Sequence, residues 1–209
     1  MRILRLVLVL AIAAVLVTAA VLLPILAGGD DPAGQAQMGP PNGSASVARE
    51  AADIDGDDLG ALREYPDLST WHVDPDETVT YDQTPPAGGE HAGHWLECGV
   101  YDEPVREENA VHALEHGTVW ITYQPDLSDA EVSKLAELLP TEGILSPYPG
   151  LRAPVVVTVW GTQLDLVGAD DPRLATFIER YGNGETAPEP MASCHGGVVR
   201  YESEDSQGP

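Results

Sequence analysis

The distribution of apolar and polar positions divides the chain into four parts. Residues 6–27 form an uncharged run of mostly Leu, Val, Ile and Ala, and residues 28–67 are rich in Gly, Pro, Ala, Asp and Ser without lasting periodicity. Residues 68–199 alternate between apolar stretches and turn residues, and residues 200–209 are polar. The pattern predicts an apolar N-terminal segment, a flexible acidic linker, one globular domain and a disordered tail.

The apolar run at residues 6–27 is long enough to cross a membrane. As a helix it would span about 33 Å, against a hydrocarbon core of about 30 Å. Arg2 and Arg5 precede the run, and Asp30 and Asp31 follow it. Because positive residues stay on the cytoplasmic side, we expect a single-pass anchor in the cell membrane with the C-terminal domain outside the cytoplasm. A cleaved signal peptide is the alternative, although its apolar region is usually only about 7–15 residues long.

The predicted domain reads as strands that alternate with helices. The expected elements are a strand at 78–81, a helix at 105–116, a strand at 118–123, a helix at 129–139, strands at 155–160 and 163–167, and a helix at 172–181. Ser128 and Glu131 have the spacing of a capping box at the start of the second helix. The order predicts an α/β or α+β fold in which helices pack on a small mixed sheet.

The same order of elements occurs in the thioredoxin fold, and two details extend the comparison. Pro154 directly precedes a strand where thioredoxin-like proteins carry a cis-proline, and Cys98 precedes the first long helix, where they carry their redox motif. The second cysteine of a C-x-x-C motif is absent, since Tyr101 occupies its position. A thioredoxin-like redox module that uses Cys98 is therefore one functional hypothesis.

The charge of the chain excludes one large class of partners. It has 34 acidic and 10 basic residues, which gives a formal net charge of −24. Nucleic-acid binding needs clustered Lys and Arg to contact phosphates, so we expect no nucleic-acid partner. The acidity predicts a well-solvated surface that can concentrate cations nearby.

The chemistry-bearing residues are concentrated in one short stretch. Four of the six histidines and one of the two cysteines lie in it, at His91, His94, Cys98, His112 and His116. Neutral imidazole and thiolate are ligands that suit zinc and copper. Since His112 and His116 are four residues apart, they share one face of the predicted helix, and Glu115 borders that face. Each histidine alone would more often cap a helix or hydrogen-bond in a loop, and we assign such structural or surface roles to His72 and His195.

The string His112-Ala113-Leu114-Glu115-His116 also fits the inverted zinc-protease pattern H-x-x-E-H. In that pattern two histidines bind zinc and the glutamate activates water. A further ligand would have to come from downstream, for example Glu185 or Glu189. Only three positions are fixed and the helix should end at once, so the pattern does not establish an enzyme.

The two cysteines allow two interpretations. In an oxidising compartment Cys98 and Cys194 should pair, and closing so long a loop would be worth about 4–5 kcal/mol in the chain-entropy model. A disulfide sulfur cannot also bind a metal as a thiolate. Cys98 is therefore either half of a structural disulfide, which we favour, or a ligand of copper or zinc.

Four stretches of the chain resemble a family known only as domain of unknown function 3105. They are Pro85-Pro86-Ala87-Gly88-Gly89-Glu90-His91, Gly99-Val100-Tyr101, Val111-His112-Ala113-Leu114-Glu115-His116-Gly117 and Tyr123-Gln124-Pro125. Members of that family are bacterial and archaeal proteins that often have one N-terminal membrane segment. Gly88 stands where the family would place Ser. The resemblance supplies no activity, but it implies that His91, His112 and His116 belong to one set of motifs.

From this set we predict a three-histidine metal site. A Pro/Gly loop would bring His91 beside the helix face with His112 and His116, and His94, Glu115 or water would complete the shell around copper or zinc. The leading hypothesis is thus a membrane-anchored extracytoplasmic domain that binds a transition metal. The alternatives are the redox module and a non-catalytic envelope interaction domain, in which the histidines only organise the Pro/Gly loop.

Overall fold

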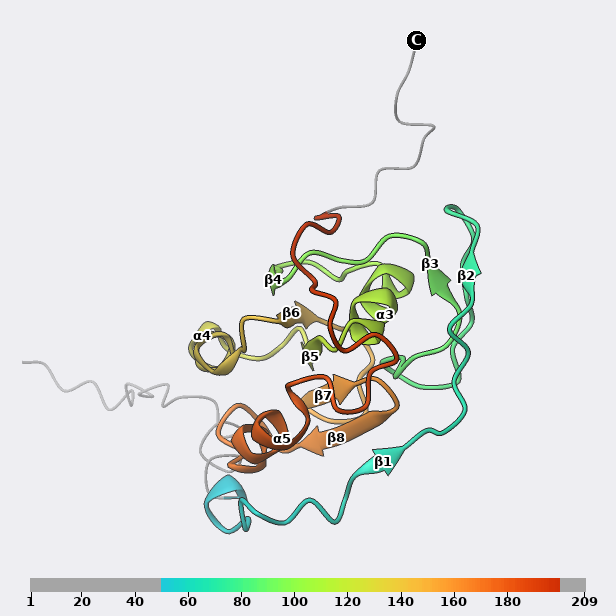
Figure 1. Cartoon of the computed structure of the whole chain (residues 1–209). Helices are drawn as coiled ribbons and strands as arrows, with labels where there is room; N and C mark the ends of the chain where they lie inside the picture. The colour runs from blue at the N-terminus through green and yellow to red at the C-terminus, as the bar shows by residue number, and fades with distance from the viewer. Residues whose placement is uncertain (1–49, 200–209) are drawn as a thin grey trace, which may run out of the picture. The chain divides into compact units, whose positions relative to one another are not determined.

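The structure, a computed structural model, describes residues 50–199. The predicted membrane anchor at 6–27, the first part of the predicted linker and the predicted tail at 200–209 lie outside the described residues. Between residues 50 and 199, no helix is both long and apolar enough to span a membrane. The described residues form a mixed α/β fold (Figure 1).

Strands and helices alternate along most of the fold. In chain order they are β1 (Arg63–Glu64), β2 (His72–Val73), β3 (His91–Ala92), β4 (Gly99–Val100), α3 (Glu107–Glu115), β5 (Val119–Tyr123), α4 (Asp129–Leu138), β6 (Gly143–Pro147), β7 (Val155–Val159), β8 (Thr162–Leu166) and α5 (Arg173–Tyr181). Six strands form one sheet in the order β1-β8-β7-β5-β6-β4, and β2 pairs with β3 separately. β5 and β6 are parallel and joined through α4, whereas β7 is antiparallel to β5 and β8.

Helices cover both faces of the large sheet. Side chains of a strand alternate between the two faces, and β5 shows this directly. Ile121 belongs to the apolar cluster that includes Leu135 of α4 and Phe177 of α5. Trp120 belongs to the cluster that includes Leu114 of α3. α3 therefore lies on one side of the sheet, opposite α4 and α5 (Figure 1).

Most predicted elements are confirmed to within two residues at each end. The capping box of α4 is present, because Ser128 Oγ accepts a hydrogen bond from the Glu131 backbone N–H while the Glu131 carboxylate accepts one from the Ser128 N–H. This exchange satisfies backbone donors that the first helical turn leaves free.

The structure departs from the predicted sheet at two strands, and the proline before β7 lacks the cis bond that the thioredoxin-like hypothesis requires. Residues 78–81 form no strand; the N–H of Val79 donates instead to the Glu108 carboxylate at 2.9 Å. β6, which lies between β5 and β4 and is fully buried, was not predicted from the sequence. The peptide bond before Pro154 is trans, since the cis bond in the described chain precedes Pro85.

The folded region also begins earlier than predicted. Ala51 and Leu59 are buried, and Leu59 packs into the cluster beneath α4 and α5. β1 pairs antiparallel with β8, with Arg63 opposite Gln163. The predicted boundary at residue 68 is therefore too late, because the few apolar residues of this Asp/Gly-rich segment are buried one at a time, without a periodic pattern.

Candidate metal centre

α3 carries polar residues although it is buried almost all round. Every residue from Glu108 to Glu115 is buried. The sheet covers its apolar side, where Val111 and Leu114 pack against Trp120. Buried polar groups are costly without partners, so the polar residues of this helix must be accounted for one by one.

Each polar side chain of α3 contacts a neighbouring segment. Glu108 forms an ion pair with Arg106 at 3.1 Å, and the Asn109 amide donates to the carbonyl of His94 at 2.5 Å. His112 and Glu115 meet the residues on β2 and β3. Apart from Glu107, which accepts a hydrogen bond from the Tyr148 hydroxyl, the polar side of α3 is therefore an interface with the segments that precede it in the chain.

The Pro/Gly loop before β3 is held against the β7–β8 hairpin. Its Ala87 carbonyl accepts from the Gly161 N–H at 2.7 Å, and its Pro85 carbonyl accepts from the Gln163 amide at 2.7 Å. Gly88 has φ +141°, and a Cβ at this position would lie 2.7 Å from Leu68 Cδ1. A side chain at 88 would strain the backbone and displace Leu68, so glycine suits this position, where the family resemblance led us to expect serine.

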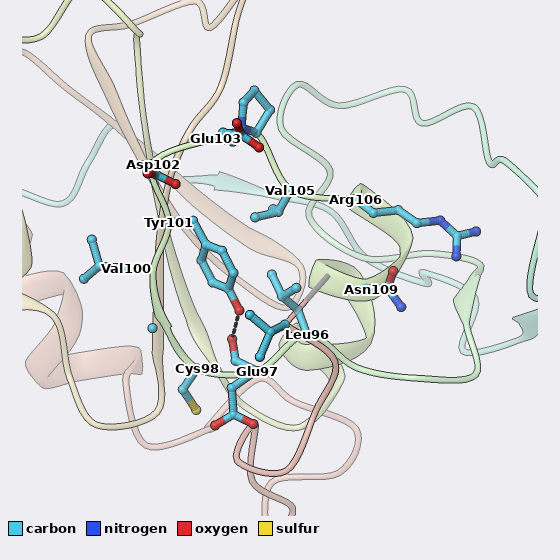
Figure 2. Close-up of a pocket in the computed structure, with 13 residues that line it drawn as sticks. Leu96, Glu97, Cys98, Val100, Tyr101, Asp102, Glu103, Val105, Arg106 and Asn109 are labelled. Carbon is cyan, nitrogen blue, oxygen red and sulfur yellow. Dashed lines mark hydrogen bonds between the residues drawn. The ribbon is translucent and has the colours of Figure 1, made fainter. Parts of the chain in front are cut away.

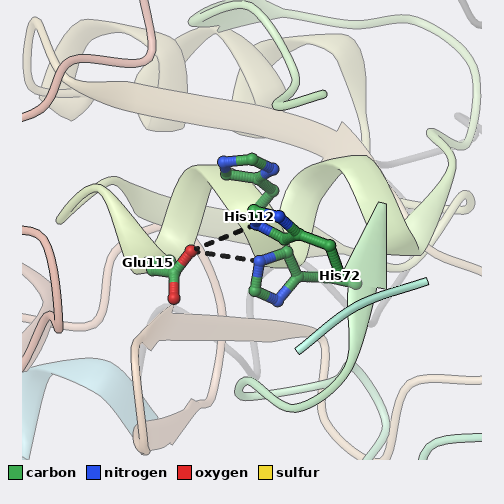
Figure 3. A group of neighbouring side chains, drawn as sticks. His72, His112 and Glu115 are labelled. Atoms are coloured by element: carbon green, nitrogen blue, oxygen red, sulfur yellow. Dashed lines mark hydrogen bonds and ion pairs between the residues drawn. The ribbon is translucent and has the colours of Figure 1, made fainter. Parts of the chain in front are cut away.

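Four side chains converge where β2, β3 and α3 meet. They are His72 of β2, His91 of β3, and His112 and Glu115 of α3. Each offers one potential ligand atom, and these atoms all lie within 4.8 Å of one another. Figure 3 shows the labelled side chains His72, His112 and Glu115 directed toward one another, with dashed lines from the Glu115 carboxylate to its imidazole neighbours. We call these four residues the His–Glu cluster.

Backbone carbonyls fix the tautomers of the two buried imidazoles. His91 Nδ1 lies 2.7 Å from the Gly89 oxygen, and His112 Nδ1 lies 2.6 Å from the Ala92 oxygen. A carbonyl can only accept, so each Nδ1 carries the proton and donates it. In the neutral rings each Nε2 then keeps a free lone pair. This arrangement, in which Nδ1–H is held by the backbone, is typical of metal-binding histidines.

Two acceptor atoms face each other inside the cluster. His91 Nε2 lies 3.0 Å from Glu115 Oε2, and His72 Nε2 lies 3.8 Å from the same oxygen. A lone pair on nitrogen and an ionised carboxylate repel each other unless a proton or a metal ion lies between them. Either a proton on the Glu115 carboxyl group or a metal ion between the atoms would make this contact favourable.

Burial favours the neutral forms of these groups. Burial lowers the pKa of His91, and it lowers the pKa of His112 to about 4. Burial also raises the pKa of Glu115, and the charge of Glu189 raises it further. The two imidazoles are thus unprotonated at neutral pH, which is the state that binds metals, and Glu115 retains a proton more readily than an exposed carboxyl does.

The donor set fits a transition metal ion. Three imidazoles and one carboxylate are ligands of the type that zinc and copper(II) accept. Tetrahedral bonds of about 2.0–2.1 Å place ligand atoms about 3.3 Å apart, so closure around an ion needs only small side-chain movements. The four residues therefore form a group that can hold a metal ion.

Two of the predicted ligands lie outside the cluster. His94 is exposed, and only its backbone oxygen is used, by Asn109. His116 has its ring centroid 4.7 Å from that of His112, but its Nδ1 donates to the Ser193 carbonyl at 3.1 Å and its Nε2 lies 3.7 Å from the Glu189 carboxylate. One further helical turn carries His116 about 5–6 Å along the axis, away from His91.

His72 takes the place in the cluster that we predicted for His116. β2 and β3 are parallel with His72 directly opposite His91, and their ring centroids are 4.8 Å apart. The His72 ring is stacked on His112 at 4.8 Å between centroids. The prediction left His72 outside the site, because a lone histidine in a short strand carried no motif that linked it to the helix.

The cysteines form a separate group. Cys98 and Cys194 are joined in a disulfide with their Cα atoms 5.2 Å apart, so the interpretation of Cys98 as a thiolate ligand is wrong. Glu142 lies against the pair and accepts from the Cys194 N–H at 2.9 Å and from the Ser193 hydroxyl. Cys98 also lines a cavity of about 550 Å³ (Figure 2) that none of the four cluster residues lines.

The comparisons with known proteins place the chain in a family. Residues 72–196, more than half of the chain, match the family described as protein of unknown function DUF3105. The chain therefore belongs to this family, as its motifs indicated. The matched region begins at His72 and contains all four residues of the His–Glu cluster. No curated protein and no solved structure gives a significant match.

Proposed function

We propose that this member of the DUF3105 family binds one transition metal ion, zinc or copper, through His72, His91, His112 and Glu115. The observation that carries the proposal is the pair of buried imidazoles whose Nδ1–H groups are held by backbone carbonyls. Both rings thereby keep Nε2 free beside a buried carboxylate. Loop organisation alone requires only the Nδ1 contacts, whereas metal binding requires the Nε2 atoms and the carboxylate as well.

The absence of available thiolates narrows the choice of metal. Both cysteines of the chain are in the disulfide, so the cluster offers nitrogen and oxygen donors. Such a set favours zinc or copper(II) over copper(I), which prefers sulfur ligands. The formal charge of −24 supports the uptake of a cation by raising its local concentration.

The purified full-length chain, stripped with a chelator, tests the proposal. We expect it to take up one zinc or copper ion per chain in a calorimetric titration. Glu115→Gln should weaken this binding by about 10- to 100-fold, because an amide is a poor ligand for these ions. Glu142→Gln is the matched control, since Glu142 lies beside the disulfide and not in the cluster.

A structural role for the histidines is the second candidate function, as part of an envelope interaction domain. The same carbonyl contacts favour it, since His91 and His112 hold the loop and β3 in place. Glu115→Gln separates the two functions. A glutamine amide can donate to His91 Nε2, so if the cluster is purely structural, this variant should be as stable as the wild type. In that case the wild-type chain should also bind no stoichiometric metal.

We also propose that the domain acts outside the cytoplasm and is attached to the cell membrane through residues 6–27. The disulfide supports this location, because disulfides persist in oxidising compartments.

A thioredoxin-like arrangement is a proposal for the central strands alone. It is supported by the parallel β5 and β6 with their crossover helix α4 and by the β7–β8 hairpin beside β5. Thiol redox chemistry gains no such support, because Cys98 pairs with a cysteine 96 residues away.

A further inference from the structure

The four members of the His–Glu cluster differ sharply in how they are held. His91 is fully buried, and the side chain of Glu115 is 5% exposed. The side chain of His72 is 52% exposed. The two buried imidazoles donate Nδ1–H to backbone carbonyls, while the contacts of His72 are its carboxylate neighbour and the rings beside it. Three members are thus fixed by the core, and one lies at its surface.

The segment that carries His72 is attached weakly to the rest of the fold. Between Trp71 and Thr80 only Val73 and Val79 are partly buried, and the other residues are exposed. None of these ten residues belongs to either apolar cluster, whereas Leu68 before them and Tyr81 after them both pack on the cluster beneath α3. We call residues 71–80 the strap. It is anchored at both ends and buries little apolar surface between them, which is the profile of a segment that opens locally.

The pairing of β2 with β3 and several polar contacts hold the strap in place, and Asp76 within it also has a partner. The His91 N–H donates to the Trp71 carbonyl at 3.1 Å, the Arg106 guanidinium donates to the Glu77 carbonyl at 2.7 Å, and the Val79 N–H reaches Glu108. Net contributions of such bonds are about 0.5–1.5 kcal/mol each, far below the stability of a core element. A bond from a bound metal to His72 would therefore be a major contact of the closed strap.

We propose that His72 is a displaceable ligand and that opening of the strap frees one coordination position for an external imidazole. This inference rests on the proposed metal binding. His91, His112 and Glu115 are the permanent ligands, a set of two histidines and one glutamate that leaves a fourth position on a tetrahedral ion. In the exchange, the bond from the metal to His72 breaks and a bond to the incoming neutral nitrogen forms, without oxidation or net proton transfer.

The charge around the cluster selects the class of external ligand. An incoming carboxylate would meet Glu115 and Glu189 in a chain of net charge −24, so an anionic donor is disfavoured. A neutral imidazole replaces His72 without a change of charge. The partner is therefore a histidine side chain of a protein that delivers the ion to this site or removes it. Trp71, which is 72% exposed beside His72, gives such a partner an apolar contact at the same point.

The test follows zinc release from the loaded full-length chain into an excess of a chromogenic chelator. We expect His72→Ala to bind one zinc ion and to release it roughly 10- to 100-fold faster than the wild type. Free imidazole should slow release from His72→Ala toward the wild-type rate, because it fills the vacated position. His94→Ala is the matched control, an exposed histidine outside the cluster that should leave the rate unchanged.

Three results would overturn the inference while metal binding by the wild type stands. The first is zinc release from His72→Ala at the wild-type rate. The second is a His72→Ala variant that loses stoichiometric zinc as completely as His112→Ala does. The third is a release rate of His72→Ala that free imidazole does not slow. A wild-type chain that takes up no stoichiometric zinc or copper would overturn the proposed function and this inference together.

Discussion

The described part of the chain holds two groups of potential metal ligands, and they differ in whether their ligand atoms are already bonded to other protein atoms. In the His–Glu cluster, two Nε2 lone pairs and a carboxylate face one another, and a proton on the carboxyl group or a bound metal ion can satisfy them. In the second group, Cys98, Glu142 and Cys194 are equally close, but the sulfurs are bonded to each other and Glu142 accepts from protein donors. Proximity alone therefore does not distinguish the two groups; the His–Glu cluster keeps lone pairs that could bind an ion, whereas the sulfurs of the second group are already bonded.

The largest effect should come from breaking the second group. Replacing both Cys98 and Cys194 by Ser removes a bridge between residues 96 apart, which the chain-entropy model values at about 4–5 kcal/mol. We expect the free energy of unfolding to fall by about this amount in urea titrations. Zinc stoichiometry of the folded fraction should not change. A double variant that loses metal binding while still folded would contradict the separation of the two groups.

The next largest effect should come from the buried imidazoles. His112→Ala removes a ligand that Ala92 orients, and we expect zinc affinity to fall by more than about 100-fold. Competition with a chelating dye measures the change, and circular dichroism checks that the variant is folded. His116→Ala is the comparison, since His116 contacts Ser193 and Glu189 outside the cluster. Equal losses in both variants would restore the motif-based prediction of the ligand set.

The pH dependence of the metal-free chain sharpens the difference between buried and exposed imidazoles. The unfolded chain titrates its histidines near the ordinary pKa of about 6.5, whereas folded His112 has a pKa of about 4. The unfolded state therefore binds more protons in this window, and the stabilisation from neutral His112 should be lost as the pH falls from about 6.5 toward 4. The raised pKa of Glu115 acts in the opposite direction, since its contribution is lost as the pH rises.

The change of stability with pH can be measured from the unfolding midpoints of the chelator-treated chain between these pH values. His112→Asn should flatten it, because asparagine does not titrate. Identical slopes in the variant and the wild type would show that His112 is not held neutral by its surroundings.

The smallest effect should come from Glu142. Its side chain is 39% exposed, and Glu142→Gln changes its hydrogen bonds to Ser193 and Cys194 and its contact with His195 at 3.9 Å. We expect a loss of at most about 1 kcal/mol in the free energy of unfolding and no change in zinc affinity. A clear loss of zinc in this variant would show that the second group also contributes to binding.

The sequence predicted correctly those helices and strands that are determined by residues close together in the chain. The capping box of α4, the β-branched run of β7 and the helix with the Leu-Glu-His-Gly stretch all lie where their residues indicated. β6 was missed because Gly143 and Pro147 at its ends resemble turn residues. Gly143 is required there by packing, since a Cβ would lie 2.7 Å from the Pro140 carbonyl oxygen.

Only those residues of the candidate site that lie in recognisable motifs were predicted from the sequence. The sequence linked His91, His112 and Glu115, which lie in recognisable stretches, and these three do meet. The choice between His72 and His116 depended on the register of β2 against β3, which is a tertiary contact without a local signal. The match to the family, which begins at His72, is the signal that could have included it.

The most direct test of the account is the X-ray absorption spectrum of the zinc-loaded full-length chain. The His–Glu cluster predicts a four-coordinate ion with three imidazole nitrogens and one oxygen at about 2.0–2.1 Å, and no sulfur. His72→Ala should reduce the imidazole count to two and add an oxygen from water. A sulfur shell, or the spectrum of a fully hydrated ion, would contradict the account.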